Sequence, residues 1–482
     1  MNKYFLKKAE ELKPRLCIKK ISADGKYDLS EGESVVFDFG THCTGYPKLH
    51  FSFSGLYPDA PALVKLRFCE TREELDEDTS SYCGWISKSW IQEELVHIDS
   101  LPCDYVCKRR YAFRYIQVEA VGLSQKFKLL ISDAQTETVT SAPEYILPCG
   151  NNSLEKEIDA VALKTLSECM QDVFEDGPKR DRRLWLGDLR LQALANYCTY
   201  AHNDLVKRCL YLFAATADDN GKISQSVFTV SDIVGDEDSL FDYSLLFIAT
   251  LVDYYEATGD KQTAKELFPL AVKQVENARR QFEGDIVQDC DRIGWCFLDW
   301  SLQLNKQAGA QAVYIYAEKA LIKLCKYLEQ PYEEYAEDVV AKSKSAISTF
   351  YDRSLGLFVS GKEKQVSYAT NIWYVIAGVF SQEQNQTILH KLQNCEDAII
   401  PITPYLMHHY IQALIDSGLK EEGKEVMLSY WGGMVKTGAD TFWELYNPKN
   451  PWETPYGGKA VNSYCHAWSC TPVYFIRKYF LK

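Results

Sequence analysis

The chain has 482 residues and a mass of 55.2 kDa, with 46% hydrophobic and 25% charged residues. This length provides for more than one domain with a full core, and the composition is that of an ordinary globular protein. The formal net charge of -14 and the absence of a long apolar run argue against a nucleic-acid partner and against a membrane partner.

The 16 cysteines are scattered from Cys17 to Cys470 and lack the paired two-residue spacing that is typical of zinc sites. The N-terminus becomes charged within three residues and has no apolar segment of the kind that secretory signals carry. We therefore expect a cytoplasmic protein with free thiols and without a metal site.

The first part of the chain, residues 1–150, reads as a β domain. Short runs rich in Val, Ile and Phe alternate with Gly, Pro and Asp, which predicts an antiparallel β-sandwich. Residues 70–100 form a longer, acidic insertion with weak patterning. The Arg109-Arg110-Tyr111 run is interpreted as a strand edge with stacked arginines, and a functional patch is the alternative.

After residue 150 the apolar period changes to 3.6, starting with an N-cap at Ser153. Helices follow at intervals of roughly 20–30 residues, including a short one over 298–305. About a dozen helices joined by alternating short and long loops predict helical hairpins curled into an α/α barrel over 151–482. The long loops should gather on one face and carry the chemistry. They are 175–188, 218–238, 283–297, 352–366 and 432–463.

The loop between Asp176 and Asp188 is the first chemical cluster. It holds three acids, four bases and Trp185, and helices need no such loop in order to fold. Burying so many charges beside an aromatic ring is costly unless they pair or bind a ligand. Carboxylates that accept hydroxyl hydrogen bonds and a Trp face that covers a pyranose ring are typical of a sugar site.

The second cluster lies between Thr441 and Trp468 and contains Trp443, Glu444 and His466. Desolvation among aromatic residues would raise the pKa of Glu444. A glycosidase needs two such carboxylates, one to protonate the leaving oxygen and one to activate water or attack the anomeric carbon.

Each of these residues also has a plain structural interpretation. Glu444 could be a paired carboxylate, and His466 could be a satisfied histidine at a helix start. Asp299 with Trp300 could be a capped helix start, and Asp242 could lie in an exposed helical turn. Their grouping with aromatic residues in long loops favours a carbohydrate site.

Other chemistries find no support in the sequence. There is no His-Glu-x-x-His run, no phosphate-binding loop and no Gly-x-Ser-x-Gly elbow. The acids from Asp232 to Asp238 lack EF-hand spacing, so we interpret that stretch as a loop at the rim of the site.

The two clusters together resemble the bacterial α-L-rhamnosidases, the family-78 glycoside hydrolases. The run 176–188 is similar to the family's Asp-Cys-Pro-x-Arg signature that ends in Gly-Asp, and the run 438–444 is similar to its Gly-Ala-x-Thr-x-Trp-Glu segment. Runs at Asp242, at Asp253 and at 297–300, and the late His466, also resemble family segments. The resemblance covers 150–482, and the β-rich half resembles the sandwich that precedes the barrel.

The resemblance implies an (α/α)6 barrel and an inverting mechanism without a cofactor. By matching positions, Asp181 would be the general acid and Glu444 the general base. Asp176, Arg180 and Asp188 would hold sugar hydroxyls, with Trp300 and His466 lining the pocket. We add Trp185, Asp242, Asp299 and Trp443 as substrate-binding residues because they belong to the same loops or motifs.

Two positions depart from the family pattern. Gly177 stands where the family has Cys, and Asp181 stands where the family has Glu, which is one methylene longer. Either Asp181 acts across a different geometry, or another carboxylate protonates the leaving group, or the sugar is not rhamnose.

The leading hypothesis is a cytoplasmic glycosidase that removes a terminal sugar from oligosaccharides or glycosides. One alternative is a catalytically weak carbohydrate-binding protein on the same scaffold. Another is an unsaturated-uronide hydrolase or lyase, because the bases in 179–183 would suit an acidic sugar. The oligomeric state stays open, with a homodimer as one option.

Overall fold

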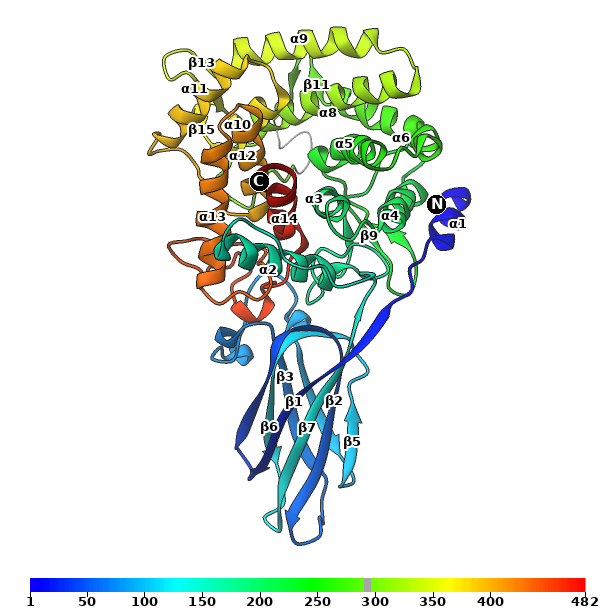
Figure 1. Cartoon of the computed structure of the whole chain (residues 1–482), viewed down its shortest axis with the longest axis vertical. Coiled ribbons are helices and arrows are strands. Elements are labelled where there is room, and N and C mark those ends of the chain that lie inside the picture. The colour runs from blue at the N-terminus through cyan, green and yellow to red at the C-terminus, as the bar shows by residue number, and fades with distance from the viewer. Residues whose placement is uncertain (290–295, 482) are drawn as a thin grey trace.

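The computed structural model describes residues 1–289 and 296–481. Figure 1 shows an elongated β domain beneath a larger helical domain. The last β-strand of the lower domain ends at Thr140 and the first helix after it begins at Ser153, on either side of residue 150. Residues 290–295 of the predicted loop 283–297 lie outside the described residues.

The β domain is a seven-stranded antiparallel sheet with the order β1-β7-β2-β6-β3-β4, and β5 pairs with β2. The strands are β1 (Cys17–Leu29), β2 (Ser34–Gly55), β3 (Ala62–Cys69), β4 (Glu93–Ile98), β5 (Cys103–Val106), β6 (Tyr111–Gly122) and β7 (Phe127–Thr140).

Strand β2 links the two halves of the sheet. Its first half pairs with β6 and its second half pairs with β7 and β5, so that hydrogen bonds run continuously across the sheet. Alternate residues such as Leu129 and Ile131 are fully buried in a core that all of the long strands share.

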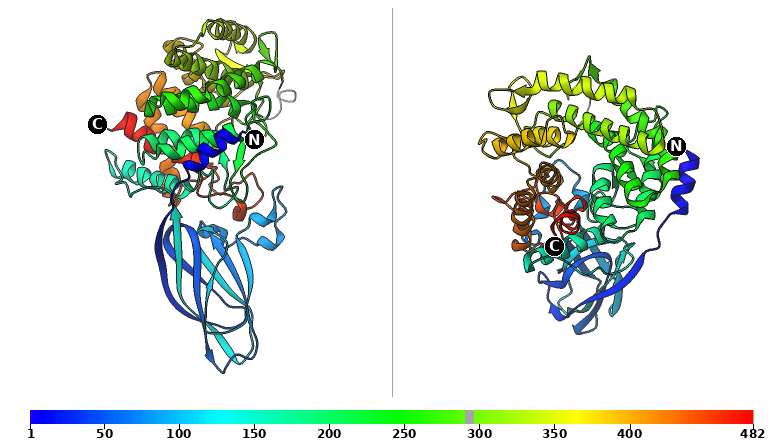
Figure 2. Two further views of the ribbon diagram at one scale, coloured as in Figure 1. Left: turned by 90° about the vertical axis from the view of Figure 1, so that its right-hand side faces the viewer. Right: turned by 45° about the horizontal axis from the view of Figure 1, so that its top comes forward.

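The helical domain is a double ring of helices, as Figure 2 shows. The inner helices are α3 (Leu186–Tyr197), α5 (Phe241–Thr258), α8 (Gln307–Leu328), α10 (Tyr368–Ala377), α12 (Pro404–Asp416) and α14 (Pro472–Phe475). The outer helices are α2 (Ser153–Cys169), α4 (Asn203–Thr216), α6 (Lys261–Arg279), α9 (Glu333–Phe350), α11 (Gln382–Gln393) and α13 (Lys420–Lys436).

Neighbouring inner helices contact one another in sequence order, and α14 contacts α3, which closes the ring. Inner helices such as α3 and α5 are buried almost all round, whereas outer helices such as α6 bury one face. The prediction of an antiparallel β domain followed by an (α/α)6 barrel is therefore confirmed. None of the described helices is long and apolar enough to cross a membrane.

Short strands fasten the loops of the barrel. They are β8 (Leu184–Trp185), β9 (Ser226–Phe228), β10 (Val234–Gly235), β11 (Phe282–Glu283), β12 (Ile286–Val287), β13 (Tyr351–Asp352), β14 (Leu357–Ser360) and β15 (Gln365–Val366). Strand β8 pairs with β9, which ties the loop before α3 to the loop before α5.

The helix predicted over 298–305 is wrong, because this segment is a loop. The backbone N–H groups of Phe297 and Leu298 donate to the buried carboxylate of Asp242, each at 3.0 Å. Leu298 has a left-handed φ of 51°, which no α-helix permits. Side-chain capping therefore holds the segment in an irregular shape.

The N-terminal helix α1 (Lys3–Glu11) departs from the expected division at residue 150, because it packs on the helical domain beside α4. Lys8 Nζ lies 2.7 Å from Glu266 Oε1, and the Arg208 guanidinium donates to the carbonyl of Ala9. Residues 1–16 thus cross from the barrel to the sheet, where β1 begins.

A buried ion cluster joins the two domains. His42 and Glu70 of the β domain lie 3.0 Å apart, and His42 also lies 3.6 Å from Glu168 of α2. Lys164 contacts Glu168 at 2.5 Å. Burial would raise the pKa of Glu168, but Lys164 and His42 outweigh it and lower that pKa to about 2.

Lys179 completes this interdomain ion cluster. Its ammonium is fully buried, contacts Glu74 and lies 3.6 Å from Glu70. Both carboxylates come from the β domain, at the start of the 70–100 insertion. The residue before Arg180 therefore anchors the first chemical loop to the other domain.

Candidate active site

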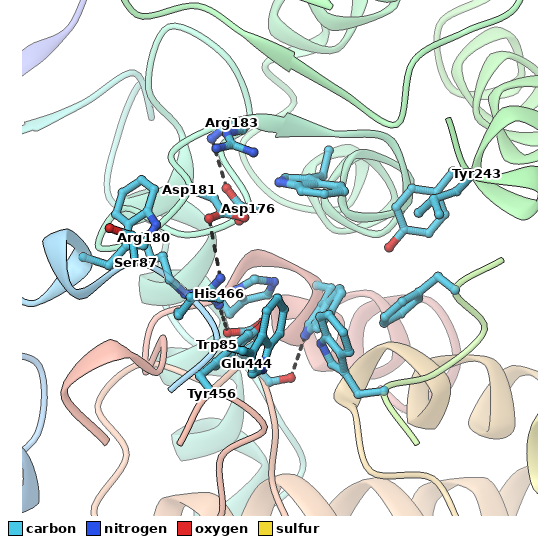
Figure 3. Close-up of a pocket in the computed structure, with 17 residues that line it drawn as sticks. Trp85, Ser87, Asp176, Arg180, Asp181, Arg183, Tyr243, Glu444, Tyr456 and His466 are labelled. Carbon is cyan, nitrogen blue, oxygen red and sulfur yellow. Dashed lines mark hydrogen bonds and ion pairs between the residues drawn. The ribbon is translucent and has the colours of Figure 1, made fainter. Parts of the chain in front are cut away.

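A cavity of about 380 Å³ opens where the two domains meet, and Figure 3 shows the side chains around it. Seven of the predicted site residues line it: Asp176, Arg180, Asp181, Trp185, Trp300, Glu444 and His466. Its volume lies within the roughly 300–1,000 Å³ that ligand pockets span. Both chemical clusters therefore border one space.

The backbone brings the two clusters together. The Ala467 amide donates to the carbonyl of Asp176 at 2.7 Å, and the His466 amide donates to the carbonyl of Phe442 at 2.8 Å. Within the first loop, the Arg183 amide donates to Asp176 Oδ1 at 3.0 Å. A main-chain hydrogen bond between residues 291 positions apart in sequence thus holds the two loops together.

Asp181 and the following Arg182 both have left-handed backbone conformations, with φ of 63° and 54°. Two successive non-glycine residues in this region cost free energy, on the order of 1–3 kcal/mol each, and such strain gathers at functional sites. The Asp181 side chain is partly exposed at 18%, so its carboxyl reaches the cavity rim.

Arg180 lies between the two acids. One guanidinium nitrogen contacts Glu444, the other lies 3.5 Å from Asp181 Oδ1, and Nε donates to the carbonyl of Val461 at 3.1 Å. The guanidinium also covers the Tyr456 ring at 4.1 Å from the centroid. Arg180 therefore stands between the two carboxyls and keeps them from direct contact.

Glu444 is almost fully buried, and the Tyr456 hydroxyl donates to its second carboxylate oxygen. Burial raises the pKa of Glu444, but Arg180, His466 and Tyr456 outweigh that effect and hold the pKa below its usual value. The main chain is fixed as well, since the Trp468 indole donates to the Glu444 carbonyl at 3.0 Å. Glu444 is therefore a carboxylate at neutral pH.

Asp176 has the opposite electrostatic character. Burial, together with the neighbouring Asp181 and Asp188 carboxyls, raises the pKa of Asp176 well above its usual value. Two acids of one loop thus differ in environment, because Asp176 is 3% exposed whereas Asp181 reaches the rim. A neutral Asp176 can donate a hydrogen bond to a ligand oxygen.

Aromatic side chains form the remaining walls of the cavity. Trp185, Tyr243 and Trp468 belong to the barrel, and the Tyr243 ring lies directly over Gly187. A Cβ atom at Gly187 would lie 2.4 Å from that ring, so the glycine makes room for Tyr243. The buried Trp185 Nε1 has no hydrogen-bond partner and is a donor for a ligand.

The comparisons with known proteins agree with this geometry. Residues 8–138 match the glycosyl hydrolase family 78 alpha-rhamnosidase N-terminal domain, and residues 146–480 match the bacterial alpha-L-rhamnosidase 6 hairpin glycosidase domain. The chain belongs to the bacterial α-L-rhamnosidases of family 78. It is thus a glycosidase of the α-L-rhamnosidase type and not an unsaturated-uronide hydrolase or lyase.

Solved structures place this rhamnosidase among its relatives. A rhamnosidase from Klebsiella oxytoca with rhamnose bound is 42% identical, with a TM-score of 0.96 over 100% of this chain and 99% of that chain. The rhamnosidase of Bacillus sp. GL1 shares 18% identity and a TM-score of 0.78 over 94% of this chain and 47% of that one, which shows the fold. A search of curated proteins returned no match.

Four predicted substrate-binding residues of this rhamnosidase do not line the cavity: Asp188, Asp242, Asp299 and Trp443. Asp188 lies behind His466, with its Oδ1 3.2 Å from Nε2 of the imidazole. Asp242 caps residues 297 and 298, and Asp299 accepts from Thr403 Oγ1 at 2.6 Å. Trp443 packs on Trp452 with ring centroids 4.8 Å apart. These residues hold the loops that carry the lining side chains.

The structure adds lining residues from the β domain. Trp85, Ile86, Ser87 and Trp90 all come from the insertion 70–100, which the sequence pattern left without a role. Hydrogen bonds fix this insertion to the second cluster, from Trp85 Nε1 to the Pro455 carbonyl at 2.7 Å and from Tyr82 to the Tyr456 carbonyl at 2.8 Å. The one feature of the sequence that could have indicated this role is the presence of two tryptophans, Trp85 and Trp90, within six residues.

The Gly177 departure has a steric reason. A Cβ atom there would lie 2.8 Å from Ser463 Oγ and 3.1 Å from the Cys465 carbonyl, so glycine lets the two loops approach. Among the described residues, 1–289 and 296–481, no group of three or more His, Cys, Asp or Glu side chains is arranged to hold a metal ion.

Proposed function

We propose that Asp181 and Glu444 carry out the hydrolysis of a terminal α-L-rhamnoside in this enzyme, with inversion at the anomeric carbon. The observation that supports these roles is the single guanidinium of Arg180, which contacts both carboxylates from inside the cavity. One sugar ring can then lie between an acid at the rim and a base at the floor.

Asp181 has the position of the general acid. The leaving oxygen of a sugar in the cavity points toward the rim, where the partly exposed Asp181 carboxyl can protonate it. The strained backbone at Asp181 and Arg182 aims the short side chain inward, which compensates for the methylene that a glutamate would add.

Glu444 has the position of the general base. Its low pKa keeps it ionised, so it can accept a proton from a water that attacks the face of the sugar opposite Asp181. A carboxylate has about four acceptor positions. Arg180 and Tyr456 occupy two of them, which leaves room for the water.

The other polar residues would bind the sugar. Arg180 and a neutral Asp176 can donate to ring hydroxyls, and His466 and the Trp185 indole add two more polar groups. The aromatic walls can pack against the apolar face and the methyl group of a 6-deoxysugar. A cavity of about 380 Å³ fits one such ring, which supports removal of a terminal residue.

The acid role can be tested with Asp181→Asn on two substrates. With an alkyl α-L-rhamnoside the variant should lose about a hundredfold in kcat, because the alkoxide leaves poorly without a proton. With 4-nitrophenyl α-L-rhamnoside the loss should be much smaller. Asp219→Asn, an exposed aspartate, is the matched control. Equal losses on both substrates would remove Asp181 from this role.

The base role has a stereochemical readout. Proton NMR during the first minutes of hydrolysis should show β-L-rhamnose before mutarotation equilibrates the anomers. If the α anomer forms first, Glu444 does not activate water for direct displacement, and the assignment fails.

We also propose a cytoplasmic location. Within the described residues the cysteines are free thiols, including Cys169 and Cys465, whose buried sulfur atoms are only 4.0 Å apart. Titration of thiols in the unfolded protein, purified without reductant, should find all 16 cysteines reduced. A disulfide between Cys169 and Cys465 would contradict the proposal.

A further inference from the structure

A second cavity, of about 260 Å³, adjoins the catalytic one. Asp181, Arg183 and Trp90 line both cavities, so the general acid stands on their shared wall. Arg109, Arg182 and the segment 228–230 complete the second cavity. Since an acid that protonates the bridging oxygen touches the sugar on one side and the leaving group on the other, the second cavity has the position of a leaving-group subsite.

Three guanidinium groups face this second cavity without a carboxylate partner. Arg109, Arg182 and Arg183 form no ion pair and no side-chain hydrogen bond with residues 1–289 or 296–481. Nε and one terminal nitrogen of Arg182 are buried without a partner. Arg183 covers the Phe228 ring at 4.1 Å, and Arg109 lies 5.6 Å from the Tyr111 ring.

The neighbouring arginines behave differently. Arg110 donates to both oxygens of Glu175 at 2.9 and 2.7 Å, and Arg180 contacts Glu444. Burial and the like charges of Arg110 and Arg109 lower the pKa of Arg182 to about 10. Among the residues that line the second cavity, Asp181 is the one acid beside three arginines, so the cavity carries an excess of positive charge that an anionic ligand would neutralise.

We propose that the second cavity binds a leaving group that carries a carboxylate, so that the preferred substrates are terminal rhamnosides of a uronic acid. The inference rests on the proposed roles of Asp181 and Glu444 and adds the substrate class. A planar guanidinium matches a carboxylate with two parallel hydrogen bonds. Trp90 and Phe228 line the same cavity and offer aromatic surface for the pyranose ring of the uronic acid.

The test compares two substrates that differ by one charge. They are α-L-rhamnosyl-(1→4)-D-glucuronic acid and its methyl ester, with the (1→2)-linked pair as the other regiochemistry. The wild-type enzyme should hydrolyse an acid with kcat/KM about tenfold or more above that of its ester, which is the scale of one charge-assisted hydrogen bond. Raising the salt concentration from 0.05 to 0.5 M should reduce this ratio.

Arg109→Gln should lower the acid-to-ester ratio about tenfold, and Arg182→Gln should lower it as well. The ratio cancels any general loss of rhamnose turnover. Lys108→Gln is the matched control, because it removes the same charge from an exposed neighbour outside the cavity, and it should keep the wild-type ratio. A ratio that falls equally in Lys108→Gln would indicate a diffuse field instead and would overturn the subsite.

Hydrolysis of 4-nitrophenyl α-L-rhamnoside distinguishes a failure of the rhamnosidase roles from a failure of the carboxylate subsite. If the wild-type enzyme does not cleave it, the proposed function fails. If it is cleaved while acid and ester react equally, or while neither disaccharide reacts, the rhamnosidase roles stand and only the carboxylate subsite is wrong.

Discussion

Lys179 and Arg180 are adjacent in sequence, yet they enter two different kinds of charged environment. Lys179 lies in the interdomain ion cluster, where Glu70 and Glu74 surround a fully buried ammonium. Arg180 enters a cavity in which polar atoms such as Trp185 Nε1 are left without protein partners. A buried charge with complete protein partners holds a structure together, whereas buried polar atoms without partners indicate a missing ligand.

Lys179→Met tests the interdomain ion cluster and has the largest expected effect on stability. Removing the ammonium leaves two buried carboxylates uncompensated, which should lower the free energy of unfolding by about 3–5 kcal/mol. Urea denaturation measures this loss. Lys207→Met removes a partly exposed ion pair in which Lys207 Nζ lies 2.9 Å from Asp260 Oδ2, and it should cost at most about 1 kcal/mol. A loss at Lys179 as small as at Lys207 would show that the cluster does not join the domains.

The pH dependence of stability tests the same interdomain ion cluster. Glu168 has a folded pKa of about 2, below the usual 4.5, so its stabilising contribution is present above about pH 4.5 and is lost as the pH falls toward 2. The full contribution is about 3 kcal/mol, taking about 1.36 kcal/mol for each pKa unit. Glu168→Gln should therefore be less stable than the wild type at pH 6, and the difference should shrink in acid. A constant difference would contradict the ion pairing with Lys164 and His42.

Glu444→Gln tests the catalytic cavity. It should lower kcat about a hundredfold, or about 2.7 kcal/mol, because the amide cannot take a proton from water. The unfolding midpoint should fall less than in Lys179→Met, since the amide oxygen can still accept from Arg180 and the cavity admits water to the guanidinium. The loss of activity should thus exceed the loss of stability, the reverse of Lys179→Met. Unchanged turnover would exclude Glu444 from catalysis.

Asp176→Asn has the smallest expected effect among the site variants. Because burial and the neighbouring Asp181 and Asp188 carboxyls raise the pKa of Asp176 well above its usual value, its neutral form is favoured, and an amide reproduces the neutrality and the donor of that form. We expect about a tenfold loss in kcat/KM, about 1.4 kcal/mol, seen mainly in KM. A loss as large as that of Asp181→Asn would indicate that Asp176 works as a carboxylate.

Much of the fold could be predicted from the sequence, because the change of apolar period near residue 150 reflects local geometry. The two charged loops were recognisable for a related reason, since helices have no need of such residues. The sequence could not separate Asp176, which faces the cavity, from Asp242, which caps backbone amides: both are buried acids near aromatic residues. Trp85 was missed because its position depends on Pro455, 370 residues away.

The path of the N-terminus constrains motion between the domains. Helix α1 is docked on the barrel and β1 lies within the sheet, so the chain crosses between the domains near residue 15 and again after residue 140. Two separated crossings restrict rotation of the sheet domain to the axis that passes through both, and the interdomain ion cluster opposes that remaining rotation. The tryptophans that the sheet domain lends to the catalytic pocket should therefore keep their alignment through each turnover, and the enzyme needs no separate closing step to bring them into place.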